Sequence, residues 1–157
     1  MAEKKEYVRE CLIETDLEVL IPDDYISSIS ERLVLYKELN DLESDEQLEA
    51  FRTRLIDRFG PIPQATEQLV QTITLRRMAK VFGIEKLVLK QQKMGCHFSH
   101  NQDNPFYHSN NFMKMIAFAN AHPTVTRLKQ ATDHLVLSYT GIDTITQAIN
   151  VLKEITH

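Results

Sequence analysis

The sequence predicts an α+β fold, in which an N-terminal segment of three helices precedes a small, mainly antiparallel sheet built from hairpins with two further helices. Helix-length apolar patterns fill residues 24–82, whereas short alternating segments arrive in pairs after residue 83. Strands that arrive as hairpins favour antiparallel pairing. With only 4 glycines in the chain, a parallel nucleotide-binding sheet with its phosphate loop is not indicated.

The helical segment contains three predicted helices. Apolar residues at helical spacing predict the first over residues 24–39, capped by Asp24, with one face formed by Ile26, Ile29, Leu33 and Tyr36. The second begins at a capping box over residues 44–47 and ends at Gly60, because glycine suits the left-handed position after a helix. The third runs over residues 63–82 and is predicted to be buried on more than one face.

Five strands and two more helices complete the predicted fold. The strands cover residues 16–21, 84–90, 96–99, 126–130 and 134–139. A turn at residues 93–95 joins the second strand to the third. A short apolar, methionine-containing helix over residues 112–119 is predicted to belong to the core, and Asp143 is predicted to cap a C-terminal helix.

Length and charge favour one domain that is not dedicated to nucleic acid. Residues 1–16 are charge-rich and weakly patterned, which predicts a linker or a piece of a preceding region, and residues 17–157 are predicted to form a single domain. Residues 1–60 hold 16 acidic and 8 basic side chains, whereas residues 61–157 hold 6 and 10. The net charge of -4 argues against a dedicated nucleic-acid-binding protein.

The sequence also predicts the compartment. Cys11 and Cys96 are the two cysteines and are far apart, so a disulfide framework has no support and a reducing cytoplasm is favoured. No apolar run approaches the ~20 residues of a membrane helix, and the first six residues lack the apolar stretch of a signal peptide. We therefore expect a cytoplasmic protein without a membrane partner.

Catalytic motifs are absent from the sequence, which contains no phosphate loop, dinucleotide fingerprint, nucleophile elbow or His-Glu-x-x-His pair. We therefore expect no enzymatic activity, no cofactor and no metal. The best metal candidates are Cys96, His97, His100 and His108, but neighbours on a strand face opposite sides, so Cys96 and His97 cannot both reach one ion without a bulge. A nucleophile pair of Cys96 with a histidine has less support, because nothing local orients such a pair.

Two charged clusters are candidate binding sites. The first, a basic cluster formed by Arg76, Arg77, Lys80 and Lys86, would contact RNA or DNA, but the aromatic residues that stack on bases are missing, so a solvated face is favoured.

The second cluster lies at the end of the helix that stops at Gly60. Asp57 and Arg54 point away from its apolar stripe, and Arg58 lies on the flank. This arrangement suits docking through charge-assisted hydrogen bonds. The structural alternative is a solvated Asp57 with Arg58 bracing the last helix carbonyls, and the residues alone favour that alternative.

Four segments carry a resemblance to a known family. They are Leu20-Ile21-Pro22-Asp23-Asp24-Tyr25-Ile26, Arg32-Leu33-x-x-Tyr36-Lys37, Leu55-Ile56-Asp57-Arg58-Phe59-Gly60-Pro61-Ile62-Pro63 and Gly83-Ile84-x-Lys86-Leu87. In this order and with similar gaps, they resemble the C-terminal domain of the bacterial transcription-repair coupling factor, also called Mfd. The resemblance covers roughly residues 17–155.

The resemblance implies a fragment of a large ATP-driven DNA translocase, which displaces stalled RNA polymerase at lesions and recruits the damage-recognition protein UvrA for nucleotide excision repair. The motor motifs would lie outside this chain. In that family the C-terminal domain docks on the N-terminal UvrA-binding module of the same protein and hides its surface, so the implied role is autoinhibition. We expect the isolated fragment to be a monomer.

The resemblance also implies which residues dock. Family contacts to the UvrA-binding module come from the helix that ends in Asp-Arg-Phe-Gly, which matches Asp57 and Arg58. The position one turn earlier is commonly an acid in the family but is Arg54 here, so the partner surface would have to differ with it. The expected docking site is therefore Asp57, Arg58 and Arg54, and the alternative is a nucleic-acid-binding module that uses the basic cluster.

Overall fold

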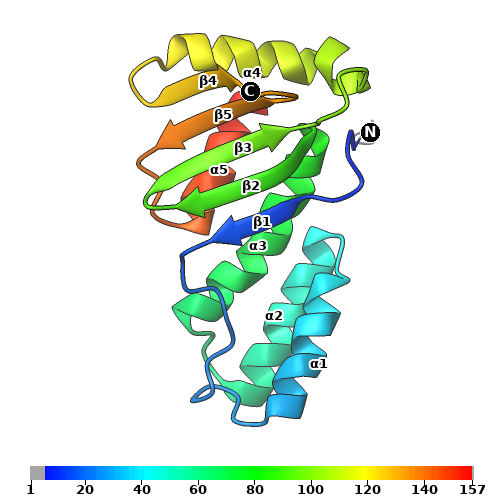
Figure 1. Ribbon diagram of the computed structural model, residues 1–157. Helices are drawn as coiled ribbons and strands as arrows, with labels where there is room; N and C mark the ends of the chain where they lie inside the picture. The colour runs from blue at the N-terminus through cyan, green and yellow to red at the C-terminus, as the bar shows by residue number, and fades with distance from the viewer. Residues whose placement is uncertain (1–5, 157) are drawn as a thin grey trace. The chain divides into compact units, whose positions relative to one another are not determined.

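The computed structural model describes residues 6–156, which belong to two compact units (Figure 1). The first, which we call the helical unit, consists of residues 18–74. The second, the sheet unit, combines the described residues up to Leu17 with those from Leu75 onward. The boundary between the units falls inside one continuous helix, α3 (Gln64–Val81).

The helical unit consists of α1 (Ile29–Asn40), α2 (Asp45–Phe59) and the first part of α3. The helix α2 begins at the predicted capping box, in which the Ser44 hydroxyl accepts a hydrogen bond from the Gln47 N–H and the Gln47 side chain accepts one from the Ser44 N–H. It ends at Gly60, which has a φ of 87°. Residues with a side chain rarely adopt this positive φ, whereas glycine adopts it readily. Both predicted ends of α2 are therefore confirmed.

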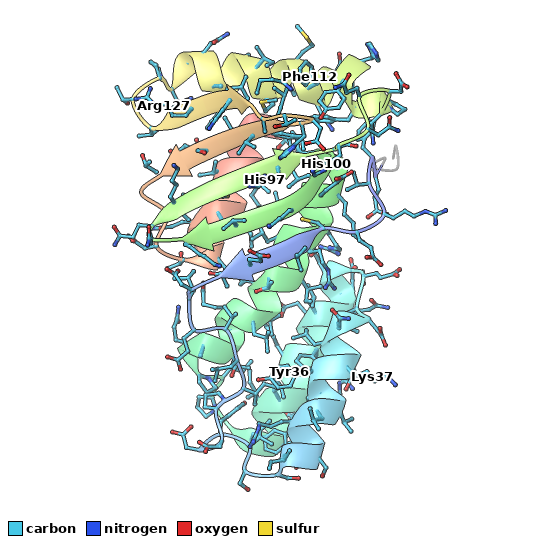
Figure 2. All side chains as sticks on the ribbon, viewed as in Figure 1. Tyr36, Lys37, His97, His100, Phe112 and Arg127 are labelled. Carbon is cyan, nitrogen blue, oxygen red and sulfur yellow. The ribbon has the colours of Figure 1, made fainter. Side chains whose placement is uncertain are left out.

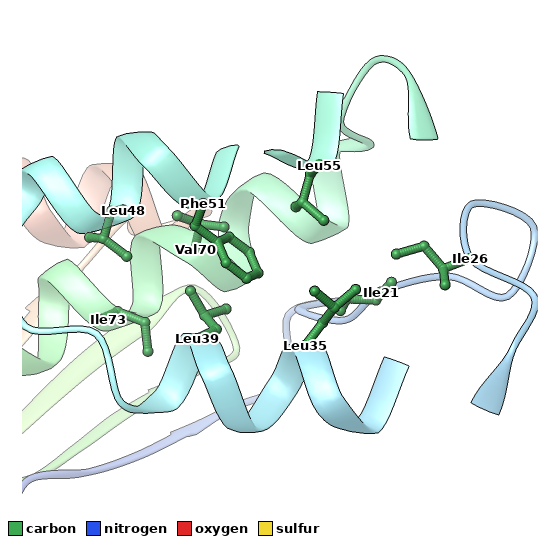
Figure 3. Close-up of a cluster of buried hydrophobic side chains, with 9 residues drawn as sticks. All are labelled: Ile21, Ile26, Leu35, Leu39, Leu48, Phe51, Leu55, Val70 and Ile73. Carbon is green, nitrogen blue, oxygen red and sulfur yellow. The ribbon is translucent and has the colours of Figure 1, made fainter. Parts of the chain in front are cut away.

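The core of the helical unit is a single cluster of buried apolar side chains (Figure 3). Its members come from all three helices and from the segment before α1, and they are Ile21, Ile26, Leu35, Leu39, Leu48, Phe51, Leu55, Val70 and Ile73. The hydroxyl of Tyr25 donates a hydrogen bond to the carbonyl oxygen of Gly60 over 2.9 Å. Apolar packing and this bond together fix the corner where α2 ends.

The sheet unit is built on five strands, β1 (Leu12–Thr15), β2 (Ile84–Lys90), β3 (Lys93–Phe98), β4 (Thr126–Gln130) and β5 (Leu135–Thr140). Their order in the sheet is β1-β2-β3-β5-β4. The first pair is parallel and the other three are antiparallel. The second hairpin therefore enters the sheet through its later strand, β5, which pairs with β3.

The sheet has one apolar face and one polar face. The helix α5 (Ile145–Thr156) covers the apolar face (Figure 1) and buries six side chains, Ile145, Ala148, Ile149, Val151, Leu152 and Ile155. The helix α4 (Asn110–Ala121) contacts α5, β4 and the short 3-10 helix η1 (Pro105–His108). Along β3, Cys96 is fully buried and His97 is only half-buried, so the face that bears His97 is the polar one.

The predicted fold class is confirmed as α+β, with five α-helices and a five-stranded mixed sheet among residues 6–156. The strand predicted over residues 16–21 is wrong. Residues 12–15 form that strand instead and pair in parallel with β2, so part of the segment predicted as a linker belongs to the sheet. The chain then continues into the helical unit, where the N–H of Leu20 donates to the carbonyl oxygen of Ala65. The domain division at residue 16 stays a prediction.

The start and the buried face of α1 also differ from the prediction. Ser28, rather than Asp24, caps the helix and accepts a hydrogen bond from the N–H of Glu31. Ile29 and Leu33, which the sequence places on one apolar face of this helix, are 68% and 62% exposed. The core instead takes Leu35 and Leu39. Because apolar residues occur on more than one side of α1, their spacing alone did not identify the buried side.

Two smaller predictions are wrong in position. The turn between β2 and β3 is formed by Gln91 and Gln92, which have positive φ angles of 52° and 61°, and not by residues 93–95. The hydroxyl of Thr144, rather than Asp143, accepts the capping hydrogen bond from the N–H of Gln147 at the start of α5. Within residues 6–156, none of the helices is long and apolar enough to cross a membrane.

Candidate functional site

The predicted docking residues lie together at the C-terminal end of α2. Arg54, Asp57 and Arg58 are exposed, whereas Phe51 and Leu55 on the other side of the helix are each 1% exposed. This is the orientation that the apolar spacing of α2 predicts. The three charged residues therefore form one surface group on the helical unit.

Both arginines of this group form ion pairs with glutamates of α1. Arg54 pairs with Glu38, and Arg58 pairs with Glu31. The guanidinium carbon of Arg58 also lies 4.7 Å from the centroid of the Phe59 ring. Arg58 therefore reaches across to α1, a partner that the sequence did not predict. Each pair joins an exposed arginine to a half-buried glutamate. Ion pairs at a protein surface typically add about 0–1 kcal/mol, so these arginines can exchange one carboxylate for another.

Asp57 has no such partner. No hydrogen bond or ion pair joins its carboxylate to another described residue. It also lies in the last turn of α2, where the helix dipole disfavours a negative charge. Neither an internal contact nor the helix dipole accounts for an acid at this position, and its carboxylate is available to donors on a partner.

A hollow of about 270 Å³ adjoins these charges. Its lining combines an apolar floor with a charged rim, and the residues are Leu35, Glu38, Phe51, Arg54, Leu55, Asp57, Arg58 and Phe59. Val34 is 64% exposed and lies on α1 between Glu31 and Glu38 at helical spacing. We call this surface, from α1 across the hollow to Asp57, the α1–α2 surface. Its mixture of apolar and charged groups resembles that of protein–protein interfaces.

The residues of the predicted basic cluster already have interactions within the chain. The ammonium group of Lys80 lies 3.9 Å from a Glu6 carboxylate oxygen, and that of Lys86 lies 3.6 Å from one of Glu14. Arg76 and Arg77 also have interactions within the chain. These acids offset part of the positive charge that would attract phosphate groups, so the pairing gives no support to a nucleic-acid surface.

The predicted metal and nucleophile candidates are distributed over the two sheet faces. Cys96 and His97 point to opposite sides of β3, as strand alternation predicts. His108 is exposed on η1. Among the described residues, the group that could hold a metal ion is His100, Asp133 and His134, which includes neither Cys96 nor His108.

Both thiols are expected to be unreactive while the chain is folded. Burial raises the pKa of Cys11 and of Cys96 to about 12, from an ordinary value of 9.0. Because the thiolate is the reactive form, a thiol reagent at pH 8 should modify the two cysteines only after denaturation. In the unfolded chain the thiols lose their protons above about pH 9, whereas in the folded chain they keep them to about pH 12. The free energy of unfolding should therefore fall as the pH rises from about 9 to about 12. Rapid labelling of the native chain would contradict this prediction.

A histidine cluster that the sequence did not predict lies on the polar face of the sheet, where Figure 2 labels two of its members, His97 and His100. The ring nitrogens His97 Nδ1 and His134 Nε2 are 3.0 Å apart, and the ring centroids of His100 and His134 are 4.1 Å apart. Burial lowers the pKa of His97, and the nearby His134, Lys86 and His100 lower it further. The hydrogen bond with His134 lowers the pKa of Asp133.

Glu85 also belongs to this cluster, because its Oε2 atom lies 2.6 Å from His100 Nδ1. The sequence did not predict Glu85, Asp133 or His134 as members. His134 is two residues before Val136, so an extended chain places both on the same side of the sheet. Val136 of β5 pairs with His97 of β3. This spacing could have identified His134 as a neighbour of His97 only if the pairing of β5 with β3 had been known.

Comparisons with known proteins agree with this fold. The sequence model of the TRCF domain family matches residues 15–109 of this chain. Transcription-repair-coupling factors of Haemophilus influenzae and Escherichia coli are each 36% identical over 75 residues, which cover 48% of this chain and 6% of each relative. That of Borreliella burgdorferi is 25% identical over 140 residues, 85% of this chain and 12% of the relative. The chain thus spans a small part of the curated relatives it matches.

A solved structure has a similar fold over nearly the whole chain. It is the crystal structure of the C-terminal domain of a transcription-repair coupling factor, which is 14% identical and superposes with a TM-score of 0.71. The similarity covers 94% of this chain and 96% of that one. We conclude from the sequence match that the chain belongs to the TRCF domain family, and its fold is that of the C-terminal domain of a transcription-repair coupling factor.

Proposed function

We propose that this chain is a non-catalytic regulatory domain that docks on the N-terminal UvrA-binding module of a transcription-repair coupling factor and masks it. Docking uses the α1–α2 surface, with Asp57, Arg58 and Arg54 as its polar contacts. By this proposal the chain acts as part of an ATP-dependent translocase that works in the cytoplasm with RNA polymerase, UvrA and DNA. The isolated chain is a monomer, and the segment before β1 connects it to the motor region.

The observation that carries the proposal is the unpartnered carboxylate of Asp57. An exposed acid in the last turn of a helix, without an internal partner, contributes nothing evident to folding. It stands at the rim of the apolar-floored hollow, where a partner could combine apolar contact with a charge-assisted hydrogen bond.

The arginine pairs with α1 support an interface that forms and breaks. Glu31 and Glu38 hold Arg58 and Arg54 in the free chain. A partner carboxylate can replace either glutamate at modest net cost, because one surface ion pair is exchanged for another. Docking of the chain on the UvrA-binding module is therefore of modest affinity. Binding of RNA polymerase elsewhere on the protein can then shift the equilibrium between docked and released states toward release.

The experiment that tests the proposal is calorimetry of this chain with the N-terminal UvrA-binding module of the transcription-repair coupling factor of the same organism. We expect saturable binding that Asp57→Ala weakens at least about tenfold, because the variant removes a charge-assisted contact. Glu46→Gln is the matched control, since it removes an exposed acid at the opposite end of α2. It should leave the affinity unchanged.

The same variants separate docking from folding. Asp57→Ala should leave the free energy of unfolding unchanged or slightly higher, because it removes a negative charge from the C-terminal end of a helix. Equal affinities for wild type, Asp57→Ala and Glu46→Gln would contradict the assigned site. Direct DNA binding that depends on Arg76 or Lys80 would favour the alternative module.

A further inference from the structure

A group of imidazole and carboxylate side chains on the sheet unit lies outside the docking surface. Glu85 comes from β2, His97 from β3, and His100 from the segment after β3. Asp133 and His134 come from the turn that leads into β5. Three chain segments that are distant in sequence thus converge at one place on the polar face of the sheet.

We propose that His100, Asp133 and His134 bind one divalent transition-metal ion of the zinc type. One potential ligand atom from each residue lies within 4.8 Å of the other two. The Oδ1 atom of Asp133 is 2.8 Å from His134 Nδ1 and 3.8 Å from His100 Nε2. A tetrahedral zinc ion with bonds of about 2.0–2.1 Å needs ligand atoms about 3.3 Å apart, and these two distances lie on either side of that value.

The second nitrogen of each histidine ring is already held by a neighbour. His100 Nδ1 lies 2.6 Å from Glu85 Oε2, and His134 Nε2 lies 3.0 Å from His97 Nδ1. Each ring therefore has one nitrogen directed toward Asp133 and one that is fixed by a hydrogen bond. Metal-binding histidines characteristically have this arrangement, because a bond to the far nitrogen sets the tautomer and the orientation of the ring.

The donor set indicates which ions would bind. Two imidazoles and one carboxylate suit zinc and neighbouring transition metals, whereas magnesium and calcium prefer an all-oxygen environment. The side chains of His100 and Asp133 are 48% and 59% exposed, so an ion can enter from solvent. Asp133 and His134 also line a hollow of about 260 Å³, which leaves room for a water molecule as a fourth ligand.

The first test is calorimetric titration of the metal-free chain, without a histidine tag, with zinc chloride. We expect one ion per chain, and no saturable binding of magnesium under the same conditions. His134→Ala and Asp133→Asn should abolish saturable zinc binding. Glu85→Gln should lower the affinity about 10- to 100-fold, because it weakens the support of His100 without removing a ligand.

The matched control is His108→Ala, which removes an exposed histidine from outside the cluster. It should bind zinc like the wild type. Circular dichroism of each variant checks that the fold is kept, and wild-type zinc binding by His134→Ala or Asp133→Asn would overturn the proposal. Loss of binding in His108→Ala equal to that in His134→Ala would also overturn it.

Cobalt substitution identifies the ligand atoms independently of mutagenesis. Bound Co²⁺ should give the visible absorption of a site with nitrogen and oxygen ligands, and this absorption should disappear in His134→Ala. A thiolate-to-cobalt charge-transfer band would assign the ion to a cysteine and would overturn the proposed ligand set. The buried, protonated thiols of Cys11 and Cys96 lead us to expect no such band.

Discussion

Replacing Phe51 with alanine should lower the free energy of unfolding of the helical unit by about 3–5 kcal/mol. Phe51 is 1% exposed and belongs to the core cluster that joins α1, α2 and α3. Removing its ring leaves a cavity among side chains that are fixed by three helices, so the space cannot close fully. Urea unfolding followed by circular dichroism measures the change.

The matched control for this prediction is Ile56→Ala on the same helix. Ile56 is 50% exposed, so truncation removes little buried area and should change the free energy of unfolding by less than about 1 kcal/mol. Similar losses in both variants would mean that Phe51 does not occupy the core, and the assignment of the α1–α2 surface would fail with it.

Gly83→Ala should destabilise the sheet unit by about 2–5 kcal/mol, through two separate costs. Gly83 has a φ of 67°, which is unfavourable for alanine. A Cβ atom there would also lie 2.8 Å from Cγ of Phe106, a fully buried residue whose ring stacks on Phe98. Because Phe106 is enclosed, it cannot move away without disturbing the aromatic cluster. Thermal or urea unfolding provides the measurement.

Gly141→Ala separates these two costs. Gly141 also has a positive φ, of 87°, but a Cβ atom there would meet nothing within 4 Å. The variant should therefore show only the conformational cost of about 1–2 kcal/mol. If Gly83→Ala and Gly141→Ala destabilise the chain equally, the contact with Phe106 is not a tight one.

The parts of the fold that were predicted correctly are those whose signals are local. The capping box at Ser44 and the stop at Gly60 each depend on residues within one helical turn, and both ends of α2 are confirmed. The stripe of Leu48, Phe51 and Leu55 likewise identifies the buried side of α2 without knowledge of its neighbours.

The predictions that are wrong concern residues whose structure or burial depends on contacts with a distant segment of the chain. β1 is a strand because residues 12–15 pair with β2, more than 70 residues later, and no local pattern reports this pairing. The exposed Ile29 and Leu33 of α1 could be told from the buried Leu35 only by the position of α2 and α3. Tertiary packing thus overrides a pattern that has more than one apolar side.

The two candidate sites differ in the same way. The surface positions of Asp57 and Arg58 follow from the periodicity of one helix, so the sequence could predict them. The histidine cluster requires that β5, and not β4, lies next to β3. A hairpin can join a sheet through either strand, and the sequence alone did not show which one does so here.

Competition between this chain and UvrA for the N-terminal UvrA-binding module is the most direct measurement of the proposed masking. UvrA is bound to the labelled module, and increasing amounts of the chain are added. We predict that the chain displaces UvrA, at concentrations that exceed its own dissociation constant for the module and rise in proportion to the excess of free UvrA. Asp57→Ala should need at least about tenfold more chain, and Glu46→Gln should behave as wild type. A stable complex that contains the chain, the module and UvrA together would contradict masking.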